Sequence, residues 1–302
     1  MKQIFSIGEI LFDSFSGEKK LGGAPFNFIY HIINLTANGT FISCIGDDKP
    51  GEDILQLLKL HKISSRYVQI DKKHPTGEAL AKLDKGKVPE WIIMTGVAYD
   101  FIKLTEGITE FINKKAACIY YGTLAQRNNE SRKSIQSLFK YDTKYFYDLN
   151  IRQNFYTKEI IEESLKAANV VKLNLSELNL IKNLFPNHFK APSKLHDTAK
   201  LLIKIFNIDL LCVTMGEEGA AIFRDNDSNH YRVMVNSEEI IDTIGAGDAY
   251  SAILCIGYLK NWNIKKINIL ACEFASEIIK IRGALPPDNS IYFKYRKKID
   301  EE

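Results

Sequence analysis

The residues best suited to chemistry lie in one short stretch, Asp242-Thr243-Ile244-Gly245-Ala246-Gly247-Asp248. Two glycines separated by one alanine allow successive backbone N–H groups to approach a ligand without obstruction by side chains. The apolar run that follows, Ala249 to Ile256, predicts a buried helix, so these N–H groups would lie at its N-terminus. Unpaired donors and the positive end of the helix dipole favour an anion there, above all phosphate.

Asp248 would stand at the mouth of this anion site. A phosphate cradle that contains a carboxylate general base suits the transfer of a phosphoryl group to a hydroxyl. Taken alone, the stretch could also be a glycine-rich turn, with Asp248 an ordinary acidic residue in the first turn of a helix. The rest of the chain favours phosphoryl transfer.

Composition excludes several other classes of protein. The 302 residues are 45% hydrophobic and 25% charged, which suits an ordinary globular protein. Lys+Arg 40 against Asp+Glu 37 gives no indication of a nucleic-acid or acidic-membrane partner. The N-terminus does not resemble a secretory signal and no apolar run is long enough to span a bilayer, so we expect a cytoplasmic protein.

Cysteine and histidine patterns give no metal site. The five cysteines lack CxxC spacing and lie in apolar runs, which predicts buried thiols in a reducing compartment. The six histidines show no spacing typical of zinc ligands.

Strand and helix patterns alternate along most of the chain, starting with a strand at 4–7, a helix at 25–35, a strand at 41–45 and a helix at 52–61. Such alternation predicts a parallel sheet covered by helices. It resumes from the strand at 117–121 to the strand at 210–214, and 267–281 predicts a last long helix. The basic ending Lys294–Lys298, offset by three acidic residues, is interpreted as a solvated tail.

One segment interrupts this alternation. Two strand patterns, 76–83 and 88–94, flank the turn Asp84-Lys85-Gly86-Lys87 and predict an antiparallel hairpin. We expect the hairpin to lie off the main sheet as a lid. Its apolar residues indicate a face for a partner's lid, and therefore a homodimer, with a monomer as the alternative; they are Leu80, Ile92 and Met94.

Polar residues follow several predicted strands, and ligands bind at the carboxyl ends of the strands in open parallel sheets. Strand alternation would place Asp148, Asn150 and Arg152 on one side if the chain stayed extended. No GxxxxGK[ST] motif or strand-linked GxGxxG is present, so neither a P-loop nor a dinucleotide fold is supported. The polar groups are Asp13, Gly22-Gly23, Asp148 to Arg152, Asn174 to Glu177, Thr214 to Gly216, and Asp242 to Asp248.

Two motifs resemble those of the ribokinase, or PfkB, family of carbohydrate kinases, especially fructokinases. Gly22-Gly23-Ala24-Pro25-Phe26-Asn27 resembles the sugar-binding signature in its GGAPxN form, and 242–248 matches DTxGAGD. The resemblance implies an α/β fold: a three-layer α/β/α ribokinase-like sandwich with a mostly parallel sheet. It further implies one domain over 1–302, with a β lid from about 11–21 and 76–100. Phe28, Tyr250 and Ile253 depart from the family pattern.

The resemblance also implies roles for the phosphate-side residues. Asp248 would be the general base, and the N–H groups of Gly245, Ala246 and Gly247 would hold charge on the transferred phosphoryl. Arg152 would lie near the phosphoryl group and the substrate, with a salt bridge to a neighbouring carboxylate as the alternative.

For the acceptor and the metal, the implied residues come from three other segments. Asp13, Gly22, Gly23 and Asn27 would hold the sugar; the alternative for Asp13 is a surface turn. Mg²⁺ would be organised largely through water. The resemblance assigns it to Asn174 and Glu177, for which a helix N-cap is a compatible alternative.

Thr214, Gly216 and Gly219 would line the nucleotide side. A weaker likeness implies a K⁺ site beside the anion site, formed by Asp242 and the carbonyl groups around Ile244, Ile281 and Gly283. The expectation is an ATP- and Mg²⁺-dependent kinase that converts D-fructose to fructose 6-phosphate. Ribose, 2-keto-3-deoxygluconate or a nucleoside are alternative substrates, and a non-catalytic sugar or nucleotide sensor is the alternative from another class.

Overall fold

The centre of the protein is a nine-stranded sheet in the computed structural model, which describes residues 2–15, 18–82, 90–189 and 194–300. Its strand order is β13-β12-β11-β10-β9-β8-β1-β4-β5. Neighbours from β5 to β11 pair in parallel, and β12 and β13 join antiparallel at one edge. The strands are β1 (Gln3–Ile7), β4 (Gly39–Gly46), β5 (Val68–Asp71), β8 (Ala116–Gly122), β9 (Lys144–Asp148), β10 (Val170–Asn174), β11 (Leu210–Thr214), β12 (Ala220–Arg224) and β13 (Asp227–Tyr231).

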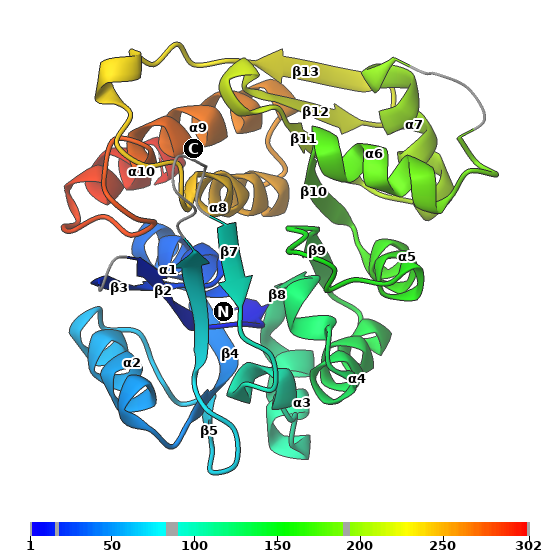
Figure 1. Ribbon diagram of the computed structural model, residues 1–302. Coiled ribbons are helices and arrows are strands. Elements are labelled where there is room, and N and C mark those ends of the chain that lie inside the picture. The colour runs from blue at the N-terminus through cyan, green and yellow to red at the C-terminus, as the bar shows by residue number, and fades with distance from the viewer. Residues whose placement is uncertain (1, 16–17, 83–89, 190–193, 301–302) are drawn as a thin grey trace.

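Helices cover both faces of this sheet (Figure 1). The first face carries α1 (Ala24–Thr36), α2 (Lys49–Leu60), α8 (Ala246–Leu259), α9 (Ile264–Ile278) and α10 (Ser290–Asp300). The second carries α3 (Glu106–Lys115), α4 (Asn129–Ser137), α5 (Lys158–Ala167), α6 (Leu175–Leu184) and α7 (Leu195–Phe206). Short 3₁₀ turns include η1 (Ala98–Phe101), η2 (Leu124–Gln126), η3 (Leu138–Lys140), η4 (Gly216–Glu218) and η5 (Ser237–Glu239).

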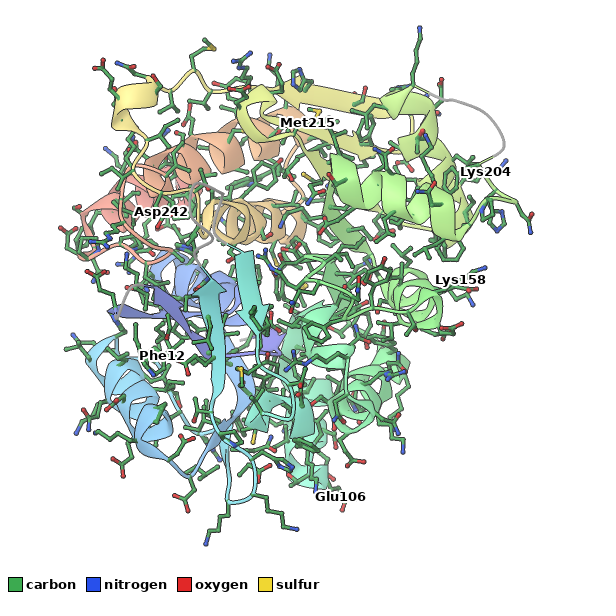
Figure 2. The ribbon with its side chains drawn as sticks, viewed as in Figure 1. Phe12, Glu106, Lys158, Lys204, Met215 and Asp242 are labelled. Carbon is green, nitrogen blue, oxygen red and sulfur yellow. The ribbon has the colours of Figure 1, made fainter. Side chains whose placement is uncertain are left out.

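Each helix layer encloses its own hydrophobic cluster against the sheet. Central strands such as β8 are buried on both faces, which explains their continuous apolar sequence. Charged side chains point outward from the helices, as Figure 2 shows for Glu106, Lys158 and Lys204. The three-layer α/β/α arrangement is therefore confirmed, and the five cysteines are buried as predicted. In the described part of the chain, no helix is both long enough and apolar enough to cross a bilayer.

The lid is a separate small sheet in the order β3-β2-β6-β7. Its strands are β2 (Leu11–Phe15), β3 (Glu18–Gly22), β6 (Gly77–Lys82) and β7 (Glu90–Ile93). β6 and β7 form the predicted antiparallel hairpin, whose turn residues 84–87 lie outside the described residues. Asp13 lies inside β2, so its assignment to the end of a central strand was wrong. The backbone N–H of Ile93 in β7 donates to Gln153 Oε1 at 3.3 Å, which joins the lid to the loop after β9.

The C-terminal segment is a helix, and its interpretation as a solvated tail was wrong. α10 buries Tyr292, Tyr295 and Ile299, which are spaced to form one helical face among the lysines. Its basic residues pair with α9, Lys294 with Glu277 at 2.8 Å. Beneath them, His31 Nδ1 of α1 lies 2.8 Å from the hydroxyl of Tyr292 in a buried hydrogen bond.

Replacing Tyr292 by Phe tests whether this buried contact secures α10. We expect a loss of about 1–3 kcal/mol in the free energy of unfolding, because His31 loses its partner in a dry environment. Denaturant titration measures the change. Phe293→Ala is the matched control on the exposed face, since Phe293 is 65% exposed, and should change stability by less than about 0.5 kcal/mol. If both variants lose the same free energy of unfolding, the buried hydrogen bond would not account for the stability that Tyr292 contributes.

Candidate active site

A pocket of about 320 Å³ lies between the lid and the N-terminus of α8. Its walls come from the lid strands, from the start of α1, from the loop after β9 and from the loop before α8. Eight of the residues given a binding or catalytic role in the sequence meet there. They are Asp13, Gly23, Asn27, Arg152, Ile244, Gly245, Gly247 and Asp248.

The N-terminus of α8 has the geometry of an anion site. Gly245 is the N-cap residue, with a left-handed φ of 80°, and a Cβ there would lie 2.4 Å from Cβ of Ala284. Only glycine therefore fits. No side chain among the described residues caps this helix, and amides in a first turn lack intrahelical partners. Ala246 N makes only a long contact, 3.4 Å, with the carbonyl oxygen of Thr243.

Asp248 projects from the first turn of α8 into the pocket. Its Oδ2 accepts a hydrogen bond of 2.8 Å from Asn27 Nδ2 in α1. Burial raises the pKa of Asp248 to about 6, against the lowering effects of Lys172, Asn27 and Arg152. A carboxylate with a pKa near neutrality is well matched to taking a proton from a hydroxyl.

A buried ion pair lies beneath the anion site. Lys172 Nζ in β10 is 2.6 Å from Asp148 Oδ2, which also accepts from Tyr120 and Ser251. Burial opposes the charge on Lys172, but Asp148 and Asp248 raise its pKa overall. A Cβ on Gly247 would lie 3.4 Å from Lys172 Nζ, so this cation is close to the first turn of α8.

Sequence reasoning missed two charged members of the pocket, Lys172 and Glu9. Lys172 lies between buried apolar residues of β10, and a charged residue in such a strand was itself a signal of a buried pair. Glu9 follows β1 and Gly8, and the apolar residues after it could have marked it as a buried acid.

Arg152 reaches the pocket by a route that strand alternation did not predict. The chain leaves extended geometry after Asp148, with left-handed φ values of 39° at Asn150 and 47° at Gln153. The extended geometry on which the expectation of a shared side depended is therefore absent: Asp148 is buried at the end of β9, whereas Arg152 is exposed. The Arg152 charge lowers the pKa values of Glu9, Asp13 and Asp248, although burial raises each overall.

The two adjacent glycines allow the Asp13 carboxylate and the backbone of Glu9 to approach closely. A Cβ on Gly22 would lie 2.3 Å from Asp13 Oδ2, and one on Gly23 would lie 2.5 Å from the Glu9 carbonyl oxygen. Gly23 also has a φ of 107°, which side chains disfavour. Burial raises the pKa of Asp13 to about 6, with Arg152 opposing the shift.

The predicted nucleotide and Mg²⁺ residues lie outside this pocket, at neighbouring strand ends. Thr214 ends β11 in register with Asn174 of β10, and Gly216 and Gly219 shape the turn around η4. Asn174 and Glu177 form a capping box on α6: Asn174 Oδ1 accepts from Glu177 N at 2.9 Å, and Glu177 Oε2 accepts from Asn174 N at 2.8 Å. The N-cap alternative is confirmed.

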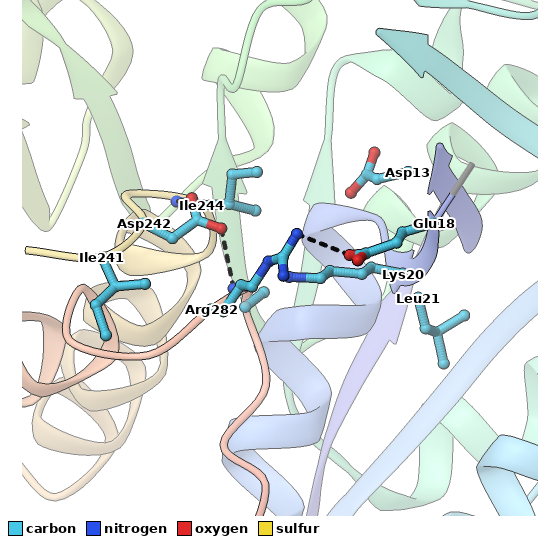
Figure 3. Close-up of a pocket in the computed structure, with 10 residues that line it drawn as sticks. Asp13, Glu18, Lys20, Leu21, Ile241, Asp242, Ile244 and Arg282 are labelled. Carbon is cyan, nitrogen blue, oxygen red and sulfur yellow. Dashed lines mark hydrogen bonds and ion pairs between the residues drawn. The ribbon is translucent and has the colours of Figure 1, made fainter. Parts of the chain in front are cut away.

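The predicted K⁺ residues divide between two places. Asp242 Oδ1 accepts from Ile244 N at 3.0 Å and Oδ2 accepts from Gly283 N at 2.9 Å, in a second pocket of about 410 Å³. Figure 3 shows Asp13 of the lid facing the same pocket, and Figure 2 places Asp242 near the start of α8. Ile281 packs against the hydrophobic cluster and is not on this wall. Among the described residues, no group of three or more His, Cys, Asp or Glu could hold a metal ion.

This geometry agrees with a sequence comparison. The model of the family described as pfkB family carbohydrate kinase matches residues 5–290. The chain belongs to the pfkB family. It is thus an ATP-dependent sugar kinase, and the matched residues include both Gly22-Gly23 and the N-terminus of α8.

Several family members resemble it over nearly their full length. An uncharacterized sugar kinase of Pyrococcus horikoshii is 27% identical, over 97% of this chain and 96% of the relative. The structure of that kinase with ATP matches with a TM-score of 0.77, covering 98% of this chain and 99% of the other. An ATP-dependent 6-phosphofructokinase of Thermoanaerobacterium thermosaccharolyticum is 25% identical over 92% and 88%. A Vibrio cholerae fructokinase structure with fructose, ADP and potassium has a TM-score of 0.77 at 18% identity, covering 98% of both chains.

Asp248→Asn tests the carboxylate of this pocket. We expect kcat for the sugar to fall by about 10²–10⁴-fold, because the amide cannot accept the hydroxyl proton. In the unaltered kinase, kcat/KM should fall as pH decreases through about 6, since protonation at the raised pKa removes the base. ADP release measured between pH 5 and 8 gives both quantities.

Stability is the control for this substitution. A pKa raised on folding means that ionised Asp248 opposes folding at neutral pH. Asp248→Asn should therefore unfold at the same or a higher denaturant concentration. If the variant is less stable than the unaltered kinase, its lost activity would be due to misfolding. Unchanged turnover in the variant would exclude Asp248 as the base.

Proposed function

We propose that this sugar kinase uses ATP and Mg²⁺ to phosphorylate D-fructose on its 6-hydroxyl. The observation that carries the proposal is the 2.8 Å contact of Asn27 with Asp248. This contact brings the GGAPxN segment to the Asp248 carboxylate in the first turn of α8. The GGAPxN form resembles that of fructokinases, and the structurally similar Vibrio cholerae enzyme is a fructokinase crystallised with fructose.

The acceptor sugar would be held from the lid and from α1. Asp13 can accept hydrogen bonds from two adjacent hydroxyls, which orients a polyol. Gly22 and Gly23 leave the space for it, and Asn27 fixes Asp248. The partly buried positions of these groups support binding of a small neutral sugar, because analogues that lack a bonded hydroxyl leave polar atoms unpaired.

In the transfer step, Asp248 would remove the proton from the attacking hydroxyl. The sugar oxygen forms a bond to the γ-phosphorus while the bond to the ADP oxygen breaks. The N–H groups of Gly245, Ala246 and Gly247 would stabilise the negative charge on the phosphoryl oxygens by hydrogen bonding. The charged guanidinium of Arg152 would form a bidentate contact with the phosphoryl group. The uncapped first turn of α8, with Lys172 beneath it, supports this assignment.

Thr214, Gly216 and Gly219 would line the nucleotide, beside Asn174 at the next strand end. Each carboxylate oxygen of Glu177 already accepts a hydrogen bond from a backbone N–H, Oε1 from Ile151 N at 2.7 Å and Oε2 from Asn174 N. Asn174 and Glu177 would therefore hold Mg²⁺ through water molecules rather than directly. Mg²⁺ when bound would offset the phosphate charge.

We also propose K⁺ beside the anion site. Asp242 and the carbonyl groups around Ile244 and Gly283, which line one pocket, would surround it. This proposal is supported by the hydrogen bonds that Asp242 accepts from Ile244 N and Gly283 N, which join the loop before α8 to the loop after α9. A potassium ion is bound in the similar Vibrio cholerae fructokinase.

A sugar panel tests the substrate. We expect D-fructose to give the highest kcat/KM, by at least about tenfold, over ribose, 2-keto-3-deoxygluconate and a nucleoside. Fructose 6-phosphate belongs in the panel because Lys20 and Arg282 line the second pocket and a phosphofructokinase is a relative. ADP release measures the rates, and phosphorus NMR locates the new ester. Inert fructose with another sugar active would overturn the choice of fructose.

We further propose a homodimer formed through the lid. Leu80, Ile92 and Met94 are 40%, 40% and 44% exposed on the lid strands or next to them, an unusual apolar surface for a free sheet. Ile92→Asp should give a monomer in sedimentation velocity. Leu60→Asp, at an apolar position 72% exposed on α2, should leave the dimer unchanged. A monomeric unaltered protein, or a dimer that survives Ile92→Asp, would refute this interface.

A further inference from the structure

Glu9 is a buried acid on the wall of the acceptor pocket. It lies in the same pocket as Asp248 and is only 2% exposed. Its Oε2 has no hydrogen-bond partner in the part of the chain that the structure describes. Buried carboxylate oxygens in folded proteins are nearly always paired, so this atom calls for a partner from outside the chain.

Two cationic groups influence the Glu9 carboxyl. Burial raises the pKa of Glu9 to about 7, and Asp248 adds to the shift, whereas Arg152 and Arg127 lower it. Arg152 comes from the loop after β9 on the pocket wall. Arg127 follows η2 and is not on that wall. Positive charge inside the pocket and outside it therefore favours the ionised form of the Glu9 carboxyl.

The guanidinium of Arg127 is held rigidly. Nε donates to Asp100 Oδ1 at 2.7 Å, and Nη2 donates to Asp100 Oδ2 at 3.0 Å and to the Met94 carbonyl oxygen at 2.6 Å. The rings of Tyr99 and Phe155 lie 5.0 and 4.6 Å from it. Like Glu9 Oε2, Arg127 Nη1 and the Tyr99 hydroxyl are buried without a partner among the described residues.

We propose that Glu9 is a second substrate-binding carboxylate, whose Oε2 accepts a hydrogen bond from a sugar hydroxyl other than the one that is phosphorylated. The inference rests on the proposed sugar kinase function, but not on fructose as the sugar.

The charges indicate what this part of the pocket accepts. Glu9, Asp13 and Asp248 all line it, against the cations Arg152 and Lys172. Carboxylates accept from hydroxyls and repel anions. The substrate is therefore a neutral polyol at the end that reaches Glu9, and a phosphate or carboxylate on the sugar would have to point elsewhere.

Glu9→Gln tests the proposal, with D-fructose or whichever panel sugar the unaltered kinase phosphorylates. We expect KM for the sugar at pH 8, above the raised Glu9 pKa of about 7, to rise roughly 10- to 100-fold, because a neutral amide replaces an ionised acceptor. The kcat value and the KM for ATP should change far less. Glu52→Gln is the control, since Glu52 is an exposed carboxylate on α2 and should alter none of these constants.

Deoxy sugars provide a readout that a purely structural role would not move. The unaltered kinase should discriminate against the analogue that lacks the bonded hydroxyl by roughly 10- to 100-fold. Glu9→Gln should lose that discrimination at one position of the sugar and keep it at the others. Glu9→Asp, which keeps the charge but shortens its reach, is the second variant if Glu9→Gln does not fold, and should show the same selective loss.

The outcomes separate this inference from the choice of substrate. If fructose is inert but another sugar reacts, the choice of fructose fails while Glu9 is tested with the reactive sugar. If every deoxy penalty persists in both variants, Glu9 does not touch the sugar and an interior water pairs Oε2. A kinase that neither binds nor phosphorylates any sugar of the panel would overturn both proposals.

Discussion

The hydrogen bond between Asn27 and Asp248 is the contact on which the site depends. It joins residues 221 positions apart, one at the start of α1 and one in the first turn of α8. Each helix has glycine next to its start, Gly23 before α1 and Gly245 before α8, because neighbouring backbone or side-chain atoms leave no space for a Cβ. The close approach of the two helix N-termini then places the proposed base, Asp248, and the uncapped amides of α8 in the pocket proposed to bind the sugar.

This concentration of acid groups has a cost in stability. Burial raises the pKa values of Glu9, Asp13 and Asp248, so each ionised carboxylate opposes folding. The cations Arg152 and Lys172 offset part of that cost. Of these two cations, Lys172 is buried and paired closely with Asp148, whereas Arg152 is exposed. A less acidic pocket would be expected to fold more stably and to bind and activate a polyol less well, which is a common relation between stability and activity.

The sequence allowed the layered fold and most of the pocket to be predicted, for physical reasons that are local. Strand and helix periodicity specified the sheet, and the need for free amides marked Gly245 to Asp248. Contacts made by the tertiary fold were not predictable in this way. The left-handed residues after Asp148 turn Arg152 away from its strand, Lys172 and Glu9 gain importance only from their buried neighbours, and α10 hid its apolar face among lysines.

The division of the site between lid and body has a mechanical consequence. Asp13 belongs to lid strand β2, whereas Asp248 belongs to α8, so the two carboxylates lie on separate structural units. β3 ends at Gly22 and α1 starts at Ala24, so Gly23 is the single residue in this one of the connections between lid and body. Displacing the lid would carry Asp13 away from the base. An open lid would then leave the sugar without one of its proposed ligands, so a sugar could contact both carboxylates only when the lid lies over the pocket.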